Sequence, residues 1–328
     1  VGLFRQHCDF WCLHVLLVVF VVDLTETFQA DLGILGGVEK ADHLLEMGVH
    51  VFEGDVTDRE SMRTPMQGCD CVFHVAGWYK VGVKDKSPGY QVNVQGTRNV
   101  LELMRDLDIP KGVYTSTVAV NSDTHGEMRD ESFCFSGKHI SEYDRTKAKA
   151  HEIARQFIKD GLPLVILMPG LIYGPDGTSL SDESLRLYLQ RKLPMIPKRS
   201  AFCWSHVDDI AEAHLLAMNN AEPGSIYMIT GPVHTLTEAF KLAEDITGVK
   251  KPMTVPPGLL RITGFFSSLI EWLVPLPPLY SSEALRVQAG ITYLGDNSRA
   301  KQDLGYNPRP LADGLKETLL YEQSRLND

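Results

Sequence analysis

The stretch EYDRTKAKAHEIARQFIK (residues 142–159), followed closely by LVILM (residues 164–168), decides the fold class. We interpret the first string as a helix and the second, an apolar run that ends at Pro169-Gly170, as a buried strand. The same alternation precedes it, with strands predicted at Val49–Glu53, Cys71–Val75 and Gly112–Ser116 and helices at Ser61–Met66 and Val92–Leu107. This order predicts an α/β protein with a doubly wound parallel sheet and right-handed crossovers.

The pattern loosens after about residue 175. An amphipathic insertion is predicted over residues 179–198, a helix opens at residues 206–209 with Asp208 as a candidate N-cap, and Ile226–Thr230 reads as a strand. We therefore predict a dinucleotide-binding domain of residues 1–175, to which residues 203–233 return. A smaller, mostly helical substrate-binding cap is predicted from residues 176–202 and 234–328.

Composition narrows the class of protein. The chain has 328 residues, of which 44% are hydrophobic and 23% charged, values that exclude collagen, coiled coil and wholesale disorder. Lys and Arg number 32 against 42 Asp and Glu, a net charge of −10 that argues against a nucleic-acid partner. The six scattered cysteines favour reduced thiols in a cytoplasmic protein.

Two apolar stretches bear on membrane insertion. Residues 10–22 give a run of only 13 residues with His14 inside it, and residues 259–274 are interrupted by Arg261 and Glu271. A spanning helix needs about 20 apolar residues, so we predict no transmembrane segment. The second stretch is typical of an amphipathic helix that packs in the cap, forms a dimer contact or lines an apolar pocket.

Tyr143 and Lys147 carry the chemical signal. On a helix, positions i and i+4 share one face, which brings a phenol beside an ammonium. A nearby positive charge should lower the phenol pKa from about 10 and fit Tyr143 for proton exchange with a substrate oxygen. Thr117, at the carboxyl end of a predicted strand, supplies a hydroxyl for the same oxygen. Tyr188 and Lys192 repeat the spacing without such a partner, so we interpret Tyr188 as a helix-surface tyrosine.

A resemblance follows from these motifs. The chain resembles the extended short-chain dehydrogenase/reductase family, also called the NAD-dependent epimerase/dehydratase family, whose dinucleotide-binding domain has the Rossmann fold. The matching motifs are Gly54-Asp55-Val-Thr-Asp58, His74-Val-Ala-Gly77, Asn93-Val-Gln-Gly-Thr97, Thr115-Ser-Thr117, Tyr143-xxx-Lys147, the run from Pro169 to Pro175, and His206-Val-Asp-Asp209. Within the family, the Trp78-Tyr79 pair and the apolar tail are most similar to the dihydroflavonol-reductase and 3β-hydroxysteroid-dehydrogenase branch.

The resemblance implies a role for each matched residue. Tyr143 would be the general acid/base, Lys147 would bind the nicotinamide ribose and tune Tyr143, and Thr117 would hydrogen-bond the reacting oxygen. The residues implied in cofactor binding, NAD or NADP, are Asp55, Val56, Ala76, Gly77, Thr115, Tyr143, Lys147, Pro169 and Gly170. Trp78 and Tyr79 should face the substrate. His74 is favoured as a packing residue, Asn93 as a fold-stabilising one, and His206 and Asp208 as residues that hold the cap against the sheet.

The N-terminal 48 residues depart from the family pattern, which opens with a Gly-x-x-Gly-x-x-Gly turn at a helix N-terminus. Gly2 is followed by no further glycine until Gly33. Three explanations stay open. In the first, the chain starts inside the motif, with residues 15–23 as the second strand and Asp23 at the ribose. In the second, residues 1–37 are out-of-frame translation, and in the third, pyrophosphate binding has been lost. The choice between NAD and NADP stays open with them.

The reaction is predicted from what surrounds these motifs. Thr117 is followed by Val118-Ala119 instead of the extra acid of sugar-nucleotide dehydratases, so dehydration is disfavoured. We hypothesise hydride transfer between nicotinamide and a hydroxyl or carbonyl carbon of a small apolar or aromatic substrate. The alternatives are a nucleotide-sugar epimerase without net redox and a non-catalytic dinucleotide sensor. No metal is predicted, and a homodimer is an open expectation.

Overall fold

A computed structural model describes residues 19–23, 29–35, 42–46, 49–175, 177, 179–270 and 281–327. Among these residues, no helix is both long and apolar enough to cross a bilayer.

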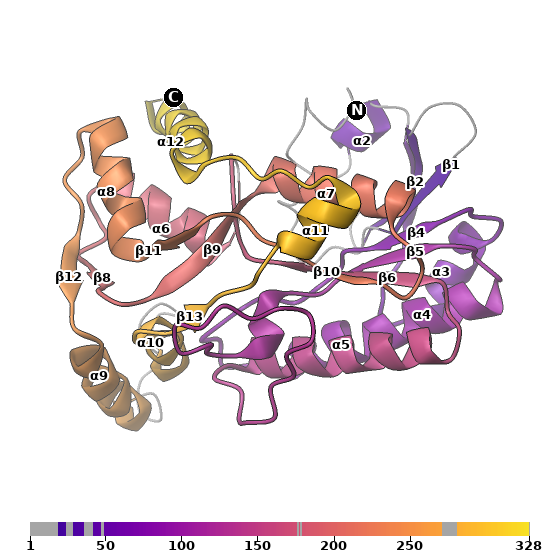
Figure 1. Cartoon of the computed structure of the whole chain (residues 1–328), viewed down its shortest axis with the longest axis horizontal. Coiled ribbons are helices and arrows are strands. Elements are labelled where there is room, and N and C mark those ends of the chain that lie inside the picture. Colours follow the sequence, from indigo (N-terminus) through magenta and orange to yellow (C-terminus); the bar gives the residue numbers. More distant parts are fainter. Residues whose placement is uncertain are drawn as a thin grey trace.

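A seven-stranded sheet forms the centre of the molecule (Figure 1). Its strands run, from one edge to the other, β10 (Ile226–Ile229), β6 (Leu164–Pro169), β5 (Gly112–Thr115), β4 (Val72–His74), β1 (Val19–Asp23), β2 (Gln29–Leu35) and β3 (His50–Glu53). Pairing is parallel from β10 through β6 and β5 to β4, and again between β2 and β3. The predicted doubly wound α/β sheet is confirmed.

One strand departs from this parallel order. β1 runs antiparallel to both of its neighbours, β2 and β4. One explanation of the N-terminus required residues 15–23 as the second strand, of which residues 15–18 lie outside the described residues. The strand next to β3 is β2, so residues 19–23 are not that second strand. Asp23 ends a strand that points opposite to β4, and therefore lies away from the edge where the parallel strands end. Gly33 lies within β2.

Helices cover both faces of the sheet (Figure 1). One face packs against α3 (Arg59–Met66), α4 (Thr97–Asp106) and α5 (Glu142–Lys159), with Val100, Met104, Ala150 and Phe157 in the shared core. The other packs against α7 (Val207–Asn220) and α11 (Ser298–Leu304) through Ile210, Ala213, Ala217 and Leu304. Burial on both faces explains why the inner strands read as unbroken apolar runs.

The remaining elements lie at the other end of the sheet. β9 (Ala201–His206) pairs with β7 (Leu171–Tyr173), β11 (Val233–Thr235) and β13 (Thr292–Tyr293), while β8 (Met195–Pro197) pairs with β12 (Met253–Val255). The helices here are α6 (Leu180–Leu189), α8 (Leu236–Thr247), α9 (Pro257–Ile270), α10 (Ser282–Gln288) and α12 (Leu311–Asn327). A short helix α2 (Asp42–Glu46) precedes β3. The insertion predicted over residues 179–198 is thus α6 followed by β8.

Most predicted bounds agree within a few residues, and α5 begins and ends where the sequence placed it. Two details differ. The predicted helix 92–107 is a π-helical stretch η3 (Gly89–Gly96) that continues into α4. The N-cap of α7 is His206, which accepts a hydrogen bond from the Asp208 backbone N–H, so Asp208 is not the cap.

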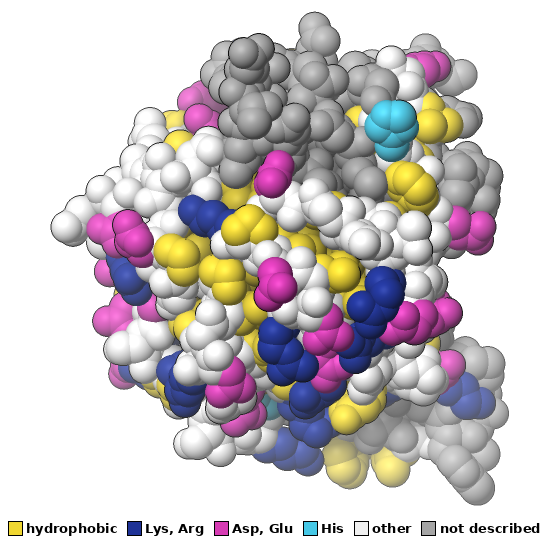
Figure 2. Space-filling view, turned by 90° about the vertical axis from the view of Figure 1, so that its right-hand side faces the viewer, with side chains coloured by type: hydrophobic (Ala, Val, Ile, Leu, Met, Phe, Trp, Pro, Cys, Tyr) yellow, Lys and Arg dark blue, Asp and Glu magenta, His cyan; other side chains and the backbone are white. Residues whose placement is uncertain are grey.

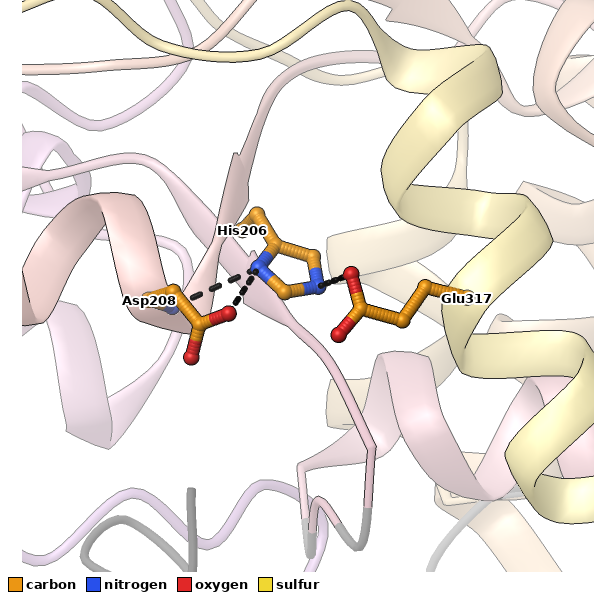
Figure 3. Close-up of side chains that lie close together, drawn as sticks. All are labelled: His206, Asp208 and Glu317. Carbon is orange, nitrogen blue, oxygen red and sulfur yellow. Dashed lines mark hydrogen bonds and ion pairs between the residues drawn. The ribbon is translucent and has the colours of Figure 1, made fainter. Parts of the chain in front are cut away.

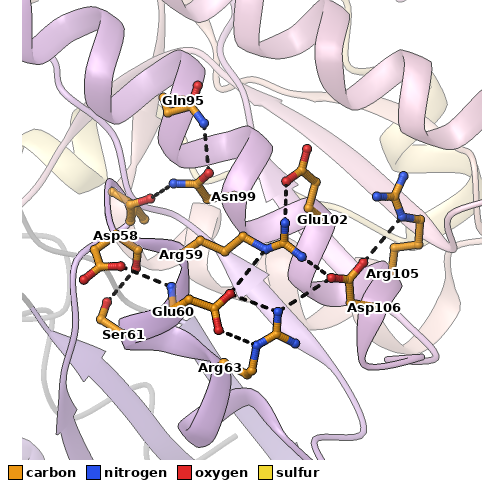
Figure 4. A network of polar contacts seen from close by, with 11 residues as sticks. Asp58, Arg59, Glu60, Ser61, Arg63, Gln95, Asn99, Glu102, Arg105 and Asp106 are labelled. Carbon is orange, nitrogen blue, oxygen red and sulfur yellow. Dashed lines mark hydrogen bonds and ion pairs between the residues drawn. The ribbon is translucent and has the colours of Figure 1, made fainter.

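Ion pairs fasten α3 to α4 (Figure 4). The Arg59 guanidinium contacts Glu102 at 2.9 Å and also pairs with Asp106. The Asn99 amide donates to the Val56 carbonyl at 2.7 Å, which fixes the turn that follows β3 against α4. Acidic and basic side chains are interspersed across the face at the right-hand side of Figure 1 (Figure 2).

Candidate active site

The first turn of α5 places the two residues of the Tyr-xxx-Lys motif. Ser141 is the N-cap, and its hydroxyl oxygen accepts from the Asp144 N–H at 3.0 Å and donates to the Asp144 carboxylate at 2.7 Å. These bonds satisfy groups that a helix start leaves open and fix the turn that carries Tyr143. The helix then runs along the sheet, so Lys147 reaches the carboxyl end of β5.

Lys147 is held in place by β5. Its Nζ donates to the Thr115 carbonyl at 2.8 Å and to the Tyr114 hydroxyl at 3.3 Å, and it lies 4.9 Å from the centre of the Tyr114 ring. The side chain is buried, and burial lowers the pKa of Lys147 to about 7. An ammonium has three N–H donors, so one remains beyond the two that β5 takes.

Tyr143 is partly exposed at the same edge. Desolvation raises its pKa to about 12, and a hydrogen bond with Thr117 only partly opposes this rise. The sequence predicted a lowered pKa from the neighbouring ammonium. That expectation was wrong for this state, because Lys147 donates to β5 and burial dominates at Tyr143. At neutral pH Tyr143 is therefore a phenol, the form that donates a proton.

The lowered pKa of Lys147 has a consequence for stability. The unfolded side chain titrates near 10.5, so between pH 7 and that value the unfolded chain binds one more proton here than the folded chain. The free energy of unfolding therefore rises with pH in this window. We expect the wild type to gain about 2 kcal/mol from pH 7 to pH 9 relative to Lys147→Met, measured by urea unfolding.

Lys149→Met is the matched control, since Lys149 is exposed on the same helix. Its stability should follow that of the wild type at both pH values. Parallel pH profiles for the wild type and Lys147→Met would show that Lys147 does not titrate in this window.

The turns after β3 and β4 hold the next residues implied in cofactor binding. Asp55 is exposed, and its carboxylate accepts from the Thr57 N–H at 2.8 Å, while Val56 is buried beneath α4. Ala76 is buried and Gly77 is partly exposed. A Cβ on Gly77 would lie 3.8 Å from the Lys147 Nζ, so this backbone borders the lysine.

Three further predicted residues follow β5 and β6. The Thr115 side chain bonds His214 at 2.7 Å, so it is the Thr115 carbonyl, through Lys147, that belongs to the site. Pro169 ends β6. A Cβ on Gly170 would lie 2.3 Å from the Cys203 carbonyl, so the close approach of β9 already requires glycine there. The sheet thus brings all these strand ends to one edge, as expected for parallel strands.

Trp78 does not lie where the sequence placed it. Its side chain is 3% exposed and packs beneath Gly89, whose Cβ would come within 2.9 Å of the indole. Asn93 accepts from the Trp78 N–H at 2.7 Å and donates to its carbonyl at 2.9 Å, which agrees with a fold-stabilising role. Only Tyr79 of the pair is partly exposed. Tyr188 also differs from its prediction, because it is buried and donates to the Val249 carbonyl at 2.5 Å.

His74 is a packing residue in this structure. It is buried, its Nε2 lies 3.0 Å from the Thr97 hydroxyl, and its ring stacks on Tyr114. Burial lowers its pKa to about 3, so the ring stays neutral. These contacts agree with the packing role favoured from the sequence.

Sequence reasoning missed Glu283, on α10. Its carboxylate accepts from the Gly82 N–H at 3.0 Å and the Glu142 N–H at 2.7 Å, and it pairs with Lys86 at 2.9 Å. One buried acid thus ties the segment after Tyr79 to the first turn of α5. No local sequence pattern predicts these contacts of Glu283, because its partners lie about 140 and 200 residues away along the chain.

His206, Asp208 and Glu317 lie together where α7 begins beside α12 (Figure 3). The His206 Nδ1 accepts from the Asp208 N–H at 3.3 Å, and its Nε2 faces Glu317 at 3.8 Å. The Arg309 guanidinium contacts Glu317 at 2.9 Å and Asp208 at 3.3 Å. A guanidinium that already neutralises both acids makes this a polar contact between α7 and α12, as the sequence suggested for His206 and Asp208, and not a cation site.

The residues present fit one end of a nicotinamide dinucleotide. The unspent N–H of Lys147 beside Gly77 suits a ribose hydroxyl, and Tyr143 with Thr117 suits a reacting oxygen. The pyrophosphate end has no counterpart among the described residues, because antiparallel β1 ends away from this edge. Asp55 and Val56 stand at the end of β3, where an adenine would be met.

Comparison with known proteins shows the family of the chain. The family model described as the NAD-dependent epimerase/dehydratase family matches residues 28–230. A putative dihydroflavonol 4-reductase of Synechocystis is 29% identical, covering 87% of this chain and 85% of that protein. 3β-Hydroxysteroid-dehydrogenase/decarboxylase isoform 2 of Arabidopsis thaliana is 26% identical, covering 92% of this chain and 57% of that protein.

Solved structures share the fold. The crystal structure of gox2253 superposes with a TM-score of 0.77 at 24% identity, covering 90% of each chain. The match therefore includes the elements beyond the central sheet as well as the sheet itself.

Proposed function

Since the chain belongs to the NAD-dependent epimerase/dehydratase family, we propose that it is an oxidoreductase that reduces the carbonyl group of a small apolar or aromatic substrate. The observation that carries the proposal is the arrangement at the end of β5. The Tyr143 phenol keeps its proton at neutral pH, the Thr117 hydroxyl acts on its pKa, and the buried Lys147 donates to the Thr115 carbonyl at the same edge.

The chain's own residues supply the proton and the positioning. The bound nicotinamide would supply or accept the hydride at the substrate carbon. The Thr117 hydroxyl would hydrogen-bond the carbonyl oxygen, and the Tyr143 phenol would give that oxygen its proton as the carbon is reduced. Tyr143 then recovers a proton from solvent. In its ammonium form, Lys147 would hold a ribose hydroxyl with its third N–H while β5 fixes the other two.

In the reductive direction Tyr143 acts as an acid. A phenol with a pKa near 12 retains its proton at neutral pH and is ready to act as an acid. Oxidation of an alcohol would first require that proton to be lost. A substrate carbonyl oxygen that accepts hydrogen bonds from the Tyr143 and Thr117 hydroxyls would replace the interaction between them.

Two observations support the substrate class. Tyr79 is a partly exposed aromatic residue just after the His74-Val-Ala-Gly77 motif. Glu283 holds the segment that follows Tyr79 against the start of α5. The names of the two relatives refer to a dihydroflavonol, for a putative reductase, and to a 3β-hydroxysteroid, which are an aromatic and a largely apolar ring compound. We extend that class to this chain as part of the proposal.

The test is net turnover of nicotinamide with panels of ketones. Purified protein is titrated with NADH and NADPH by nicotinamide fluorescence, then assayed by nicotinamide absorbance with flavanone and steroid ketones and with a small hydrophilic ketone as control. We expect binding of one cofactor and oxidation of it with the apolar ketones only. Interconversion of a nucleotide sugar with no change in absorbance would establish the epimerase alternative and contradict the proposal.

Three further assignments stay proposals. The described cysteines 69, 71, 134 and 203 form no disulfide with one another, which supports a reducing compartment such as the cytoplasm. A homodimer and the division into a dinucleotide-binding domain (1–175 with 203–233) and a cap (176–202 and 234–328) are retained as predictions.

A further inference from the structure

Helix α9 is amphipathic, and its apolar face is turned to solvent. Five large apolar residues point to solvent with 53–64% of their surface exposed: Leu259, Ile262, Phe265, Phe266 and Leu269. Leu260, Gly264 and Ser267 form the inner side, where the Cβ position of Gly264 lies 3.5 Å from Leu285 on α10. The outer residues follow the spacing of one helix face. The sequence offered cap core, a dimer contact or pocket lining for these residues, and their exposure contradicts cap core.

Such a face marks a binding surface. Fully burying a large apolar side chain stabilises it by about 1.5–3 kcal/mol relative to exposure, and contiguous exposed patches on single helices usually have a partner. α9 follows β12 directly and projects beyond it at the lower left of Figure 1. We call Leu259, Ile262, Phe265, Phe266 and Leu269 the α9 face.

The surroundings of the α9 face are basic in an acidic protein. Residues 190–206 and 246–270 contain no Asp or Glu, although acids make up about one residue in eight of the chain. The Lys and Arg residues that flank paired strands β8 and β12 are all exposed: Arg191, Lys192, Lys198, Arg199, Lys250 and Lys251. No ion pair between described residues involves any of the six.

Cations and apolar residues meet where α9 begins. A hollow of about 410 Å³ there is lined by Lys198, Arg199, Pro256, Pro257, Gly258 and Gly290. The positive end of the α9 dipole adds to the two cations, so the hollow suits an anionic group. Met195 and Met253 pair across β8 and β12 and are 44% and 73% exposed, which extends the apolar surface between the basic ends of the strands.

We propose that α9 lies in the surface of an anionic lipid bilayer, with the α9 face in the acyl boundary and the cations of β8 and β12 against the headgroups. An interfacial helix needs a strongly apolar face and cations beside it, and it lies in the membrane plane without spanning it. Unpaired cations around the apolar face complement lipid phosphates, whereas a second copy of this chain would present the same cations.

This surface connects to the proposed active site. α9 packs on α10 through Leu260 and Leu285, and α10 carries Glu283, which holds Gly82 and the start of α5. The membrane side is therefore joined through one helix to the segment that follows Tyr79. An apolar substrate dissolved in the bilayer would arrive from this side.

The test is flotation of the whole protein with vesicles of phosphatidylcholine alone or mixed with phosphatidylglycerol. We expect partition to the mixed vesicles only, weakening as salt is raised. Phe265→Ser/Phe266→Ser and Lys250→Glu/Lys251→Glu should each weaken partition about tenfold or more. Leu320→Ser and Lys316→Glu, exposed positions on α12, are the matched controls and should float like the wild type.

Several outcomes would overturn the proposal. Absence of flotation, equal partition to both vesicle types, or equal loss in the control variants would each do so. A wild-type dimer by light scattering that Phe265→Ser/Phe266→Ser dissociates would assign the α9 face to a second copy. Circular dichroism checks that the variants fold. Flotation needs no turnover, so its result is independent of the proposed reaction, and Tyr143→Phe should float like the wild type.

Discussion

Tyr143→Phe is expected to lower turnover of any carbonyl substrate by about 10²–10⁴-fold, the range for loss of a positioned general acid. The reason is local: the variant removes one hydroxyl from a partly exposed ring and leaves the backbone of α5 unchanged. Stopped-flow or steady-state nicotinamide absorbance measures kcat, and fluorescence titration measures cofactor affinity. The affinity should change little, because Lys147 keeps both of its bonds to β5.

Tyr188→Phe is the matched control for this variant. Tyr188 has the same spacing to Lys192 as Tyr143 has to Lys147. Its hydroxyl, however, is hydrogen-bonded to the Val249 carbonyl and the Thr247 hydroxyl. We expect a modest loss of stability and unchanged kcat. Most of the activity surviving in Tyr143→Phe, or an equal loss in both variants, would remove Tyr143 from the role of proton donor.

The sequence was sufficient where the signal is local. Buried parallel strands read as apolar runs, and polar or small residues just after them were placed at one sheet edge because parallel strands end together. Thus Asp55, Gly77, Thr117 and Lys147 come from separate strands and a helix to the same edge. The family match then confirmed the class of enzyme.

The sequence was insufficient where the decision is made by distant residues. Trp78 follows a strand end and reads as a substrate contact, yet Gly89 leaves a space beneath the π-helical stretch that the indole fills. Glu283 carries no motif, and its partners are set by how α10 packs. The pKa of Tyr143 depends first on burial, which raises it, and the neighbouring Thr117 only partly opposes this rise.

The five exposed apolar residues of α9 illustrate the same limit. Their helical spacing can be recognised in the sequence. The spacing does not show, however, whether the apolar helix face points to solvent or to the core, and such a face usually points to the core. Only the small inner residues and the packing of α10 show that the stripe faces out.

Arg309→Met is expected to lower the free energy of unfolding by about 3 kcal/mol, the lower end for removing one partner of a buried ion pair. The Arg309 Nε contacts the Asp209 carboxylate at 2.8 Å, and the Asp209 side chain is only 8% exposed. Methionine keeps an unbranched apolar stem but leaves that carboxylate without its cation. Urea unfolding measures the change.

Lys316→Met, on the exposed side of α12, is the matched control and should unfold like the wild type. Asp209→Asn in the Arg309→Met background should recover part of the loss, because it removes the buried charge that lacks a partner. Equal stability of Arg309→Met and Lys316→Met would show that the pair contributes little. Because Arg309 joins the start of α7 to α12, its loss should also raise KM more than it lowers kcat, since it loosens the geometry around the site without touching the proton donor.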